Sequence, residues 1–322
     1  MRIDDWSHTA RAERKKRIRQ GVVSLLPSNP CSTMLRISAE FTTRKALQET
    51  RVQMNFIPAH TVVQAPHSEP QNTAFFLHGV FGSKRNWLGF ARQLVLRAPH
   101  WQLVLVDHRH HGHSQGAQPP NTLLACANDL NRLAEFLGSR PALICGHSFG
   151  GKVALEYAVQ YPNRLEQVWV LDCPAGARPD RHKEGHPLDA VISAINAVQI
   201  PAPDRTTVVA TLMEHGFNDA TARWMTTNIV STDAGLDWQF DLQAILELLD
   251  HYFERDLWDV VYNPPFGMDI HMVKGELSDR WRPEDQAQLE RAPLVHHLPN
   301  AGHWVHVDNP STLLEWLLSH ME

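Results

Sequence analysis

The sequence reads Gly146-His147-Ser148-Phe149-Gly150 between an apolar run at 141–145 and a helix-forming stretch at 152–161, which Pro162 ends. The succession predicts a buried strand, a tight turn and a helix. Glycines at both ends of a G-x-S-x-G pattern allow the sharp turn that leaves the serine side chain exposed above a sheet edge. The amide groups that begin the following helix favour a developing negative charge. We therefore predict that Ser148 is a nucleophile.

Compact apolar runs recur on both sides of this segment. They lie at residues 73–77, 101–106, 168–171, 268–273 and 294–298. Helical patterns, such as those at 123–138 and 311–320, lie between or after these runs. Strands that alternate with helices predict an α/β fold, with a mostly parallel central sheet and helices on both faces.

The alternation stops after about residue 175. Amphipathic stretches at 188–198, 206–215 and 242–253 follow, without a strand-like run. We expect a mainly helical insertion there. The predicted parts are an N-terminal extension (1–50), a first core part (51–174), the helical insertion (175–265) and a second core part (266–322).

The composition is that of an ordinary globular chain, with 43% hydrophobic and 20% charged residues among 322. No apolar stretch approaches the roughly 18–20 residues that cross a bilayer, so we predict no integral membrane segment. The four cysteines show no C-x-x-C spacing, which indicates reduced thiols in an intracellular protein. A net charge of −5 gives no reason to expect nucleic-acid binding.

The N-terminal extension differs from the rest in charge. Residues 1–45 have a net charge of +6, whereas the remainder has −11. An arginine-rich, serine-rich and acid-poor segment is typical of an organelle transit peptide, and we expect the mitochondrial matrix or another organelle. The alternative is a basic, partly disordered arm on a cytoplasmic protein, which Asp4 and Asp5 favour. A long apolar region typical of export is missing.

A nucleophilic serine needs a base, and the base needs an acid that orients it. His303 follows the last apolar run and precedes the final helical stretch, which places it on a loop at the same sheet edge as Ser148. His306 is its rival, and we expect it to begin a helix. His296 and His297 lie within the apolar run, so packing or surface roles are expected for them. Asp172 and Asp279 each follow a predicted strand, and either loop could bring a carboxylate to His303.

A glycine turn follows the first strong strand, in Phe76-Leu-His-Gly-Val-Phe-Gly-Ser83. A backbone N–H group in such a turn, together with that of the residue after the nucleophile, can bind a tetrahedral oxyanion. The predicted donors are Val80 and Phe149, with Phe81 as the alternative if the turn lies one residue later.

A histidine-rich segment, Asp107-His-Arg-His-His-Gly-His-Ser114, resembles a metal cluster. No distant cysteine or histidine pair completes a metal-binding spacing, so we interpret the segment as a structural turn and predict no metal. The glycine-rich stretches 79–82 and 146–151 match neither a phosphate-binding loop nor a dinucleotide fingerprint, so no cofactor is predicted.

Four segments together resemble the α/β-hydrolases. They are residues 78–83, 107–114, 146–152 and 301–306. The set is similar to the branch of small bacterial carboxylesterases and thioesterase-like esterases, which includes a mitochondrial abhydrolase-domain protein. The chain departs from that branch at His110, where asparagine is usual, and at Phe149, where methionine is frequent. The residues after Asp172 also diverge.

The resemblance implies that the insertion follows the sixth strand and forms a cap over the active site. It also implies an acid after that strand, which corresponds to Asp172. Many hydrolases of this fold place the acid three residues after a loop glycine, where this chain has Ser278. Because Asp279 lies one residue further, its side chain would point elsewhere. We favour Asp172 and keep Asp279 as the alternative acid.

The expected function is that of a serine hydrolase that cleaves carboxylic esters, or thioesters, of small to medium acyl chains through an acyl-enzyme. Its partner is a small-molecule acyl ester, and the sequence leaves any protein partner unknown. Five cap residues are candidate apolar pocket walls: Trp224, Met225, Trp238, Phe240 and Leu246. The alternatives are a non-catalytic ligand-binding protein of this fold, or a triad enzyme of other chemistry: a thioesterase, a carbon–carbon bond hydrolase or a cofactor-free haloperoxidase.

Overall fold

The computed structural model describes residues 56–321, apart from 164, 182, 184 and 185. The predicted N-terminal extension at 1–50 lies outside this range, so its interpretation stays a prediction. Among the described residues, no helix combines the length and apolar character needed to cross a membrane.

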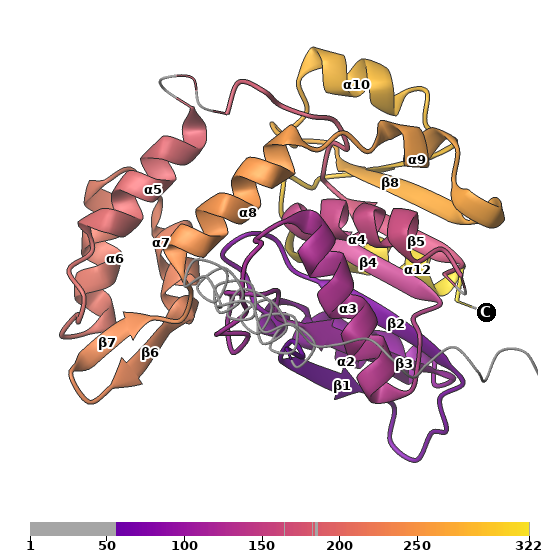
Figure 1. The fold of residues 1–322 in the computed structure, drawn as a ribbon, viewed down its shortest axis with the longest axis horizontal. Coiled ribbons are helices and arrows are strands. Elements are labelled where there is room, and N and C mark those ends of the chain that lie inside the picture. Colours follow the sequence, from indigo (N-terminus) through magenta and orange to yellow (C-terminus); the bar gives the residue numbers. More distant parts are fainter. Residues whose placement is uncertain (1–55, 164, 182, 184–185, 322) are drawn as a thin grey trace, which may run out of the picture. The chain divides into compact units, whose positions relative to one another are not determined.

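A seven-stranded sheet forms the centre, in the order β1-β3-β2-β4-β5-β8-β9 (Figure 1). Its strands are β1 (His60–Val63), β2 (Asn72–Leu77), β3 (Trp101–Val106), β4 (Leu143–His147), β5 (Gln167–Leu171), β8 (Asp269–Gly275) and β9 (Leu294–Leu298). Only β1 is antiparallel to its neighbour, which confirms the mostly parallel sheet. Parallel pairing brings the carboxyl ends of β2, β4, β5, β8 and β9 to one edge.

Helices cover both faces of the sheet. They are α2 (Leu88–Arg97), α3 (Leu123–Leu137), α4 (Phe149–Gln160), α10 (Pro283–Leu289), α11 (Val305–Asp308) and α12 (Pro310–Leu318), with the 3₁₀ turns η2 (Lys84–Trp87) and η4 (Pro265–Gly267). Successive strand residues point to opposite faces. Phe75 therefore joins the core beneath α3 and α4, whereas Phe76 joins the core beneath α2 and α12.

The insertion, here called the cap, contains more helical residues than strand residues. It contains α5 (Pro187–Ala197), α6 (Arg205–Glu214), α7 (Asp219–Met225), η3 (Thr226–Asn228), β6 (Ile229–Thr232), β7 (Gly235–Trp238), α8 (Leu242–Glu254) and α9 (Trp258–Tyr262). The β6–β7 hairpin corrects the expectation that this region has no strand (Figure 1). Its strands are too short and too exposed to give an apolar run. The cap directly follows β5 and Asp172, the place at which the family resemblance put it.

Both ends of the cap are tied to α4 by Lys152. This lysine is 1% exposed. Its Nζ donates to three backbone carbonyls, those of Gly176 (2.7 Å), Tyr252 (2.7 Å) and Arg255 (2.8 Å). Burial lowers the pKa of Lys152 to about 8. Beside it, Leu257 N donates to Ala175 O at 2.9 Å, so the start and the end of the cap lie next to each other.

Candidate active site

Ser148 occupies the turn between β4 and α4. Its φ is +52° and its ψ is −119°, a region that a residue with a side chain adopts only when its surroundings enforce it. Ser148 N donates to Leu171 O on the neighbouring strand at 2.9 Å, and Gly151 N donates to Ser148 O at 2.8 Å. A Cβ atom at Gly146 would lie 2.1 Å from Gly150 O. The turn therefore requires the glycine that the sequence pattern contains.

His303 lies on the loop between β9 and α11, and Asp172 directly follows β5. His303 Nδ1 lies 2.8 Å from Asp172 Oδ2. Because a carboxylate accepts, the Nδ1–H group donates, which leaves Nε2 as the nitrogen that can accept a proton. Ser148 lines the same cavity as His303 and Asp172. Among the described residues no hydrogen bond joins Ser148 Oγ to the His303 ring, a contact that often tightens only when substrate is bound.

Three further donors surround the buried Asp172 carboxylate. They are Gly275 N (3.0 Å to Oδ1), Trp281 Nε1 (2.9 Å to Oδ1) and Ser278 Oγ (2.5 Å to Oδ2). In the sequence, Ser278 stands at the position that the resemblance suggests for the acid, but no pattern predicts that Ser278 and Trp281 bind the Asp172 carboxylate. Their contacts depend on the path of the loop after β8, which residue types alone do not show.

Asp279, the alternative acid, points away from this group. Its side chain is 83% exposed and makes an ion pair with Arg280 at 3.3 Å. The structure therefore brings Asp172, and not Asp279, to His303.

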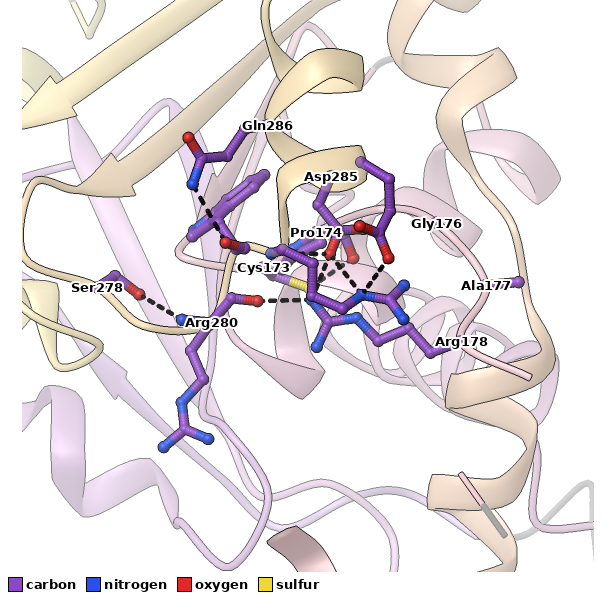
Figure 2. Close-up of polar contacts among 12 residues, drawn as sticks. Cys173, Pro174, Gly176, Ala177, Arg178, Ser278, Arg280, Asp285 and Gln286 are labelled. Atoms are coloured by element: carbon purple, nitrogen blue, oxygen red, sulfur yellow. Dashed lines mark hydrogen bonds and ion pairs between the residues drawn. The ribbon is translucent and has the colours of Figure 1, made fainter. Parts of the chain in front are cut away.

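Polar contacts fix the loop that carries Ser278 (Figure 2). Arg280 N donates to Ser278 Oγ at 3.3 Å. Arg178, at the start of the cap, donates through Nη2 to Arg280 O (2.5 Å) and to Asp285 Oδ2 (2.7 Å). Figure 2 shows the Arg178 and Asp285 side chains facing each other across these contacts. The loop that supports the acid is thus held against the first residues of the cap.

His147, inside the Ser148 turn, contacts the loop of His303. Its Nε2–H donates to His303 O at 2.8 Å, and the two rings are 4.7 Å apart. Burial, and then the neighbouring His303 and His306, hold the pKa of His147 well below its usual value. A neutral His147 therefore links the serine turn to the histidine loop.

The other histidines considered as bases lie elsewhere. His306 is on α11, as expected, and its ring stacks on Trp87 at 4.4 Å. Burial lowers the pKa of His306 to about 3. His296 and His297 lie on β9, and His296 stacks near Trp169 with ring centroids 5.3 Å apart. Within the described residues, none of these three histidines is hydrogen-bonded to the Asp172 carboxylate.

The predicted oxyanion donors lie on two sides of Ser148. Gly79 to Gly82 form a turn that Gly82 N closes on Gly79 O at 3.0 Å. A Cβ atom at Gly79 would lie 3.2 Å from Ser148 Cβ, so this turn packs directly on the serine. Within the described part of the chain, neither Val80 N–H nor Phe81 N–H has an acceptor. Phe149 begins α4, so its N–H has no partner within that helix.

The histidine-rich segment supports this turn. His78 Nδ1–H donates to Gly79 O at 2.7 Å, and His108 N donates to His78 Nε2 at 3.1 Å. The Asp107 carboxylate accepts from Lys84 N at 2.7 Å and also pairs with the Lys84 ammonium. Burial lowers the pKa of His111 to about 3. No three His, Cys, Asp or Glu side chains within the described residues are arranged to hold a metal ion.

A cavity of about 290 Å³ opens at this edge of the sheet. Ser148, Asp172, His303 and the three oxyanion candidates line it, together with apolar residues of the cap. Of the five predicted walls, Trp224 and Met225 line the cavity, but Trp238, Phe240 and Leu246 do not. Trp238 instead stacks on Phe240 at 5.0 Å, and Leu246 packs partly buried against the core. A sequence cannot tell which apolar cap residues face inward.

Comparisons with known proteins agree with this fold. The model of the Alpha/beta hydrolase family matches residues 74–316. The sn-1-specific diacylglycerol lipase ABHD11 of Mus musculus is 30% identical over 255 residues, covering 76% of this chain and 80% of that protein. Esterase YbfF of Escherichia coli (strain K12) is 26% identical, covering 78% of this chain and 94% of that protein.

Among solved structures, a marine microorganism esterase superposes with a TM-score of 0.71 at 22% sequence identity, covering 82% of this chain and 99% of that one. This likeness bears on the fold, which the sequence predicted correctly. The family model and the sequence relatives extend across most of the chain. The chain therefore belongs to the α/β hydrolase family.

Proposed function

We propose that the protein is a serine hydrolase that cleaves carboxylic esters, or thioesters, of small to medium acyl chains. The observation that carries the proposal is the 2.8 Å contact between His303 Nδ1 and Asp172 Oδ2, at a cavity that Ser148 also lines. The names of the relatives, a diacylglycerol lipase and an esterase, support ester cleavage.

The proposed reaction proceeds in two stages. His303 Nε2 takes the Ser148 proton while the serine oxygen attacks the ester carbonyl, and Asp172 holds the imidazole in the required tautomer. The N–H groups of Val80 and Phe149 stabilise the oxyanion. His303 then gives the proton to the leaving alcohol or thiol, and an acyl-enzyme forms. A water molecule, deprotonated by His303, releases the acid and restores Ser148.

The cap supplies the acyl subsite in this proposal. Concave sites with mostly apolar walls suit hydrocarbon chains, and Leu188, Phe217 and Met225 are among the cap residues at the cavity.

We propose that the chain is divided into a core (51–174 and 266–322) and a cap (175–265). The basic N-terminal extension supports a place in the mitochondrial matrix, with the cytoplasm as the alternative.

A fluorophosphonate probe tests the nucleophile. We expect the probe to label Ser148 of the wild type, as located by peptide mass, and to leave Ser148→Ala unlabelled. His303→Ala should label much more slowly, because the serine loses its base. The rate of p-nitrophenyl butyrate hydrolysis should likewise fall most in Ser148→Ala and strongly in His303→Ala. A folded wild type that neither reacts with the probe nor hydrolyses short esters and thioesters would contradict the proposal.

A further inference from the structure

Phe81 holds a left-handed backbone conformation in the turn that carries Val80. Its φ is +57°. A positive φ at the third residue of a four-residue turn is characteristic of type II, which normally has glycine or asparagine there. A phenylalanine in this conformation is strained and persists only where surrounding contacts enforce it. The turn beside Ser148 therefore needs support from outside its own four residues.

Part of this support is His78, which donates to Gly79 O at the start of the turn, and the part that acts at Phe81 comes from the cap. Asn228 Nδ2 donates to Phe81 O at 2.6 Å, across 147 positions of sequence. Asn228 is 3% exposed, so this bond does not compete with water. The Phe240 ring lies 5.4 Å from the Phe81 ring. Because Gly82 N–H closes the turn on Gly79 O, the Phe81–Gly82 peptide group is held at both its oxygen and its nitrogen.

Asn228 is itself fixed in place. Arg205 donates to the carbonyls on either side of it, through Nη1 to Thr226 O (2.9 Å) and through Nη2 to Ile229 O (3.0 Å). Gln239 N donates to Asn228 O at 2.6 Å. A donor held at its own carbonyl and at two carbonyls of the same short segment can define the orientation of a distant peptide group.

We propose that Asn228 is a positioning residue that keeps the Val80 N–H aimed at the oxyanion. The proposal rests on the ester-hydrolase function above. Without the Asn228 amide, the strain at Phe81 favours a rotation of the Phe81–Gly82 peptide group, which weakens the bond from Gly82 N to Gly79 O. Because Gly79 O and the Val80 N–H belong to one peptide group, which His78 then holds alone, the Val80 N–H moves away from the position of the negative charge. The cap then contributes to transition-state stabilisation through a residue that does not touch the reacting atoms.

Kinetics of Asn228→Ala and Asn228→Asp test this role. Loss of an oxyanion donor lowers kcat by about 10²–10³, and a misaimed donor should cost about 10- to 100-fold, with KM within about twofold. Binding of a trifluoromethyl ketone, which forms a tetrahedral oxyanion with the serine, should weaken by a similar factor. Asn228→Asp keeps the side-chain shape without the amide donor, and the thermal midpoint of each variant establishes that it is folded.

A double-mutant cycle separates positioning from general stability. Glycine at position 81 adopts the same φ without strain, so Asn228→Ala in a Phe81→Gly background should lower kcat by no more than about threefold. Glu247→Ala is the matched control, because it removes another contact between cap and core, Asn121 Nδ2 to Glu247 Oε2 at 2.9 Å. We expect its kcat to equal that of the wild type.

Three results would overturn the inference. One is an unchanged kcat in Asn228→Ala, and another is a full loss that persists in the Phe81→Gly background. The third is an equal loss in Glu247→Ala. In each case the wild type would still hydrolyse esters, so the proposed function would stand. A wild type without turnover would overturn both.

Discussion

Ser278 Oγ and His303 Nδ1 donate to the same oxygen, Oδ2 of Asp172, at 2.5 and 2.8 Å. Ser278, at the position where the family resemblance suggested an acid, instead donates to the carboxylate that follows β5. Hydrogen bonds to a charged acceptor typically stabilise by about 1.5–3 kcal/mol. Ser278 therefore helps to fix the carboxylate that accepts from His303 Nδ1.

Ser278→Ala should reduce kcat by about tenfold, because Asp172 keeps its other three donors. Steady-state hydrolysis of p-nitrophenyl butyrate measures this effect. Ser319→Ala, at the end of α12, is the control and should behave as the wild type. A wild-type rate in Ser278→Ala would mean that the Gly275 and Trp281 contacts hold the carboxylate without help.

Asp172→Asn and Asp279→Asn should differ sharply. An asparagine at position 172 stabilises the wrong tautomer of His303, and such a change lowers kcat by about 10⁴ in a serine triad. Asp279 is exposed and forms an ion pair with Arg280, so its amide variant should keep the wild-type kcat. Equal losses in the two variants would contradict the assignment of the acid.

Met225→Ala should change the preference for acyl length. Met225 is 1% exposed and lines the cavity, so its truncation enlarges the acyl subsite. We expect kcat/KM for p-nitrophenyl esters to shift toward longer chains, with the optimum about two carbons longer at roughly 0.8 kcal/mol per buried methylene. Met213→Ala, at a cap methionine that is 44% exposed, should leave the profile unchanged. Identical shifts in both variants would argue against a subsite at Met225.

Two glycine-to-alanine changes should have opposite effects on the free energy of unfolding. A Cβ at Gly146 meets backbone atoms of Gly150, which cannot move without breaking the turn, so Gly146→Ala should destabilise by about 3 kcal/mol or more. A Cβ at Gly89 on α2 meets nothing within 4 Å, and Gly89→Ala should stabilise by about 0.5–1 kcal/mol. Urea unfolding of both variants measures the difference, and a loss of stability in each would refute the steric argument.

Lowering the pH should reduce the free energy of unfolding, in part through His271. Burial, and then the neighbouring His320 and His296, lower the pKa of His271 to about 3 from its usual 6.5. Between these two values the unfolded chain binds a proton that the folded chain does not. The contribution of His271 to stability is therefore complete above pH 6.5 and is lost as the pH falls toward 3.

His271→Phe removes this titration and keeps a ring against Trp169, on which His271 stacks at 4.1 Å. Between pH 6 and 4 the unfolding free energy of the wild type should fall more steeply, by at most about 1.4 kcal/mol per pH unit. His215→Phe, at an exposed cap residue, should follow the wild-type slope. Wild-type and His271→Phe curves that run parallel would show that His271 does not titrate differently in the folded state.

The sequence predicted the parts of the molecule that depend on local pattern. A strand, a glycine turn and a helix around Ser148 are encoded within about twenty residues, and parallel pairing then places Asp172 and His303 at the same edge. The β4 strand extends two residues further than expected, through Gly146 and His147, because it continues by pairing with β5 after the apolar run ends.

Features that depend on chain path were not predicted. The β6–β7 hairpin leaves most of its side chains partly or fully exposed, and strands of four residues carry little periodicity. The contacts of Ser278, Trp281 and Asn228 join segments far apart in the sequence, so their residue types alone do not indicate them. The inward or outward direction of Trp238 and Phe240 is likewise set by packing within the cap.

The arrangement around Lys152 has a consequence for how this protein can be altered. Carbonyls from both ends of the cap accept from one ammonium group, so the chain leaves and re-enters the core at a single anchoring point. The segment between Ala175 and Leu257 therefore begins and ends at two backbone positions that are hydrogen-bonded to each other, so a segment of another length could join the same two positions. An exchange of the cap would leave Ser148, His303 and Asp172 on the core, and the new segment would have to replace the contacts that Arg178 and Asn228 make with the core loops.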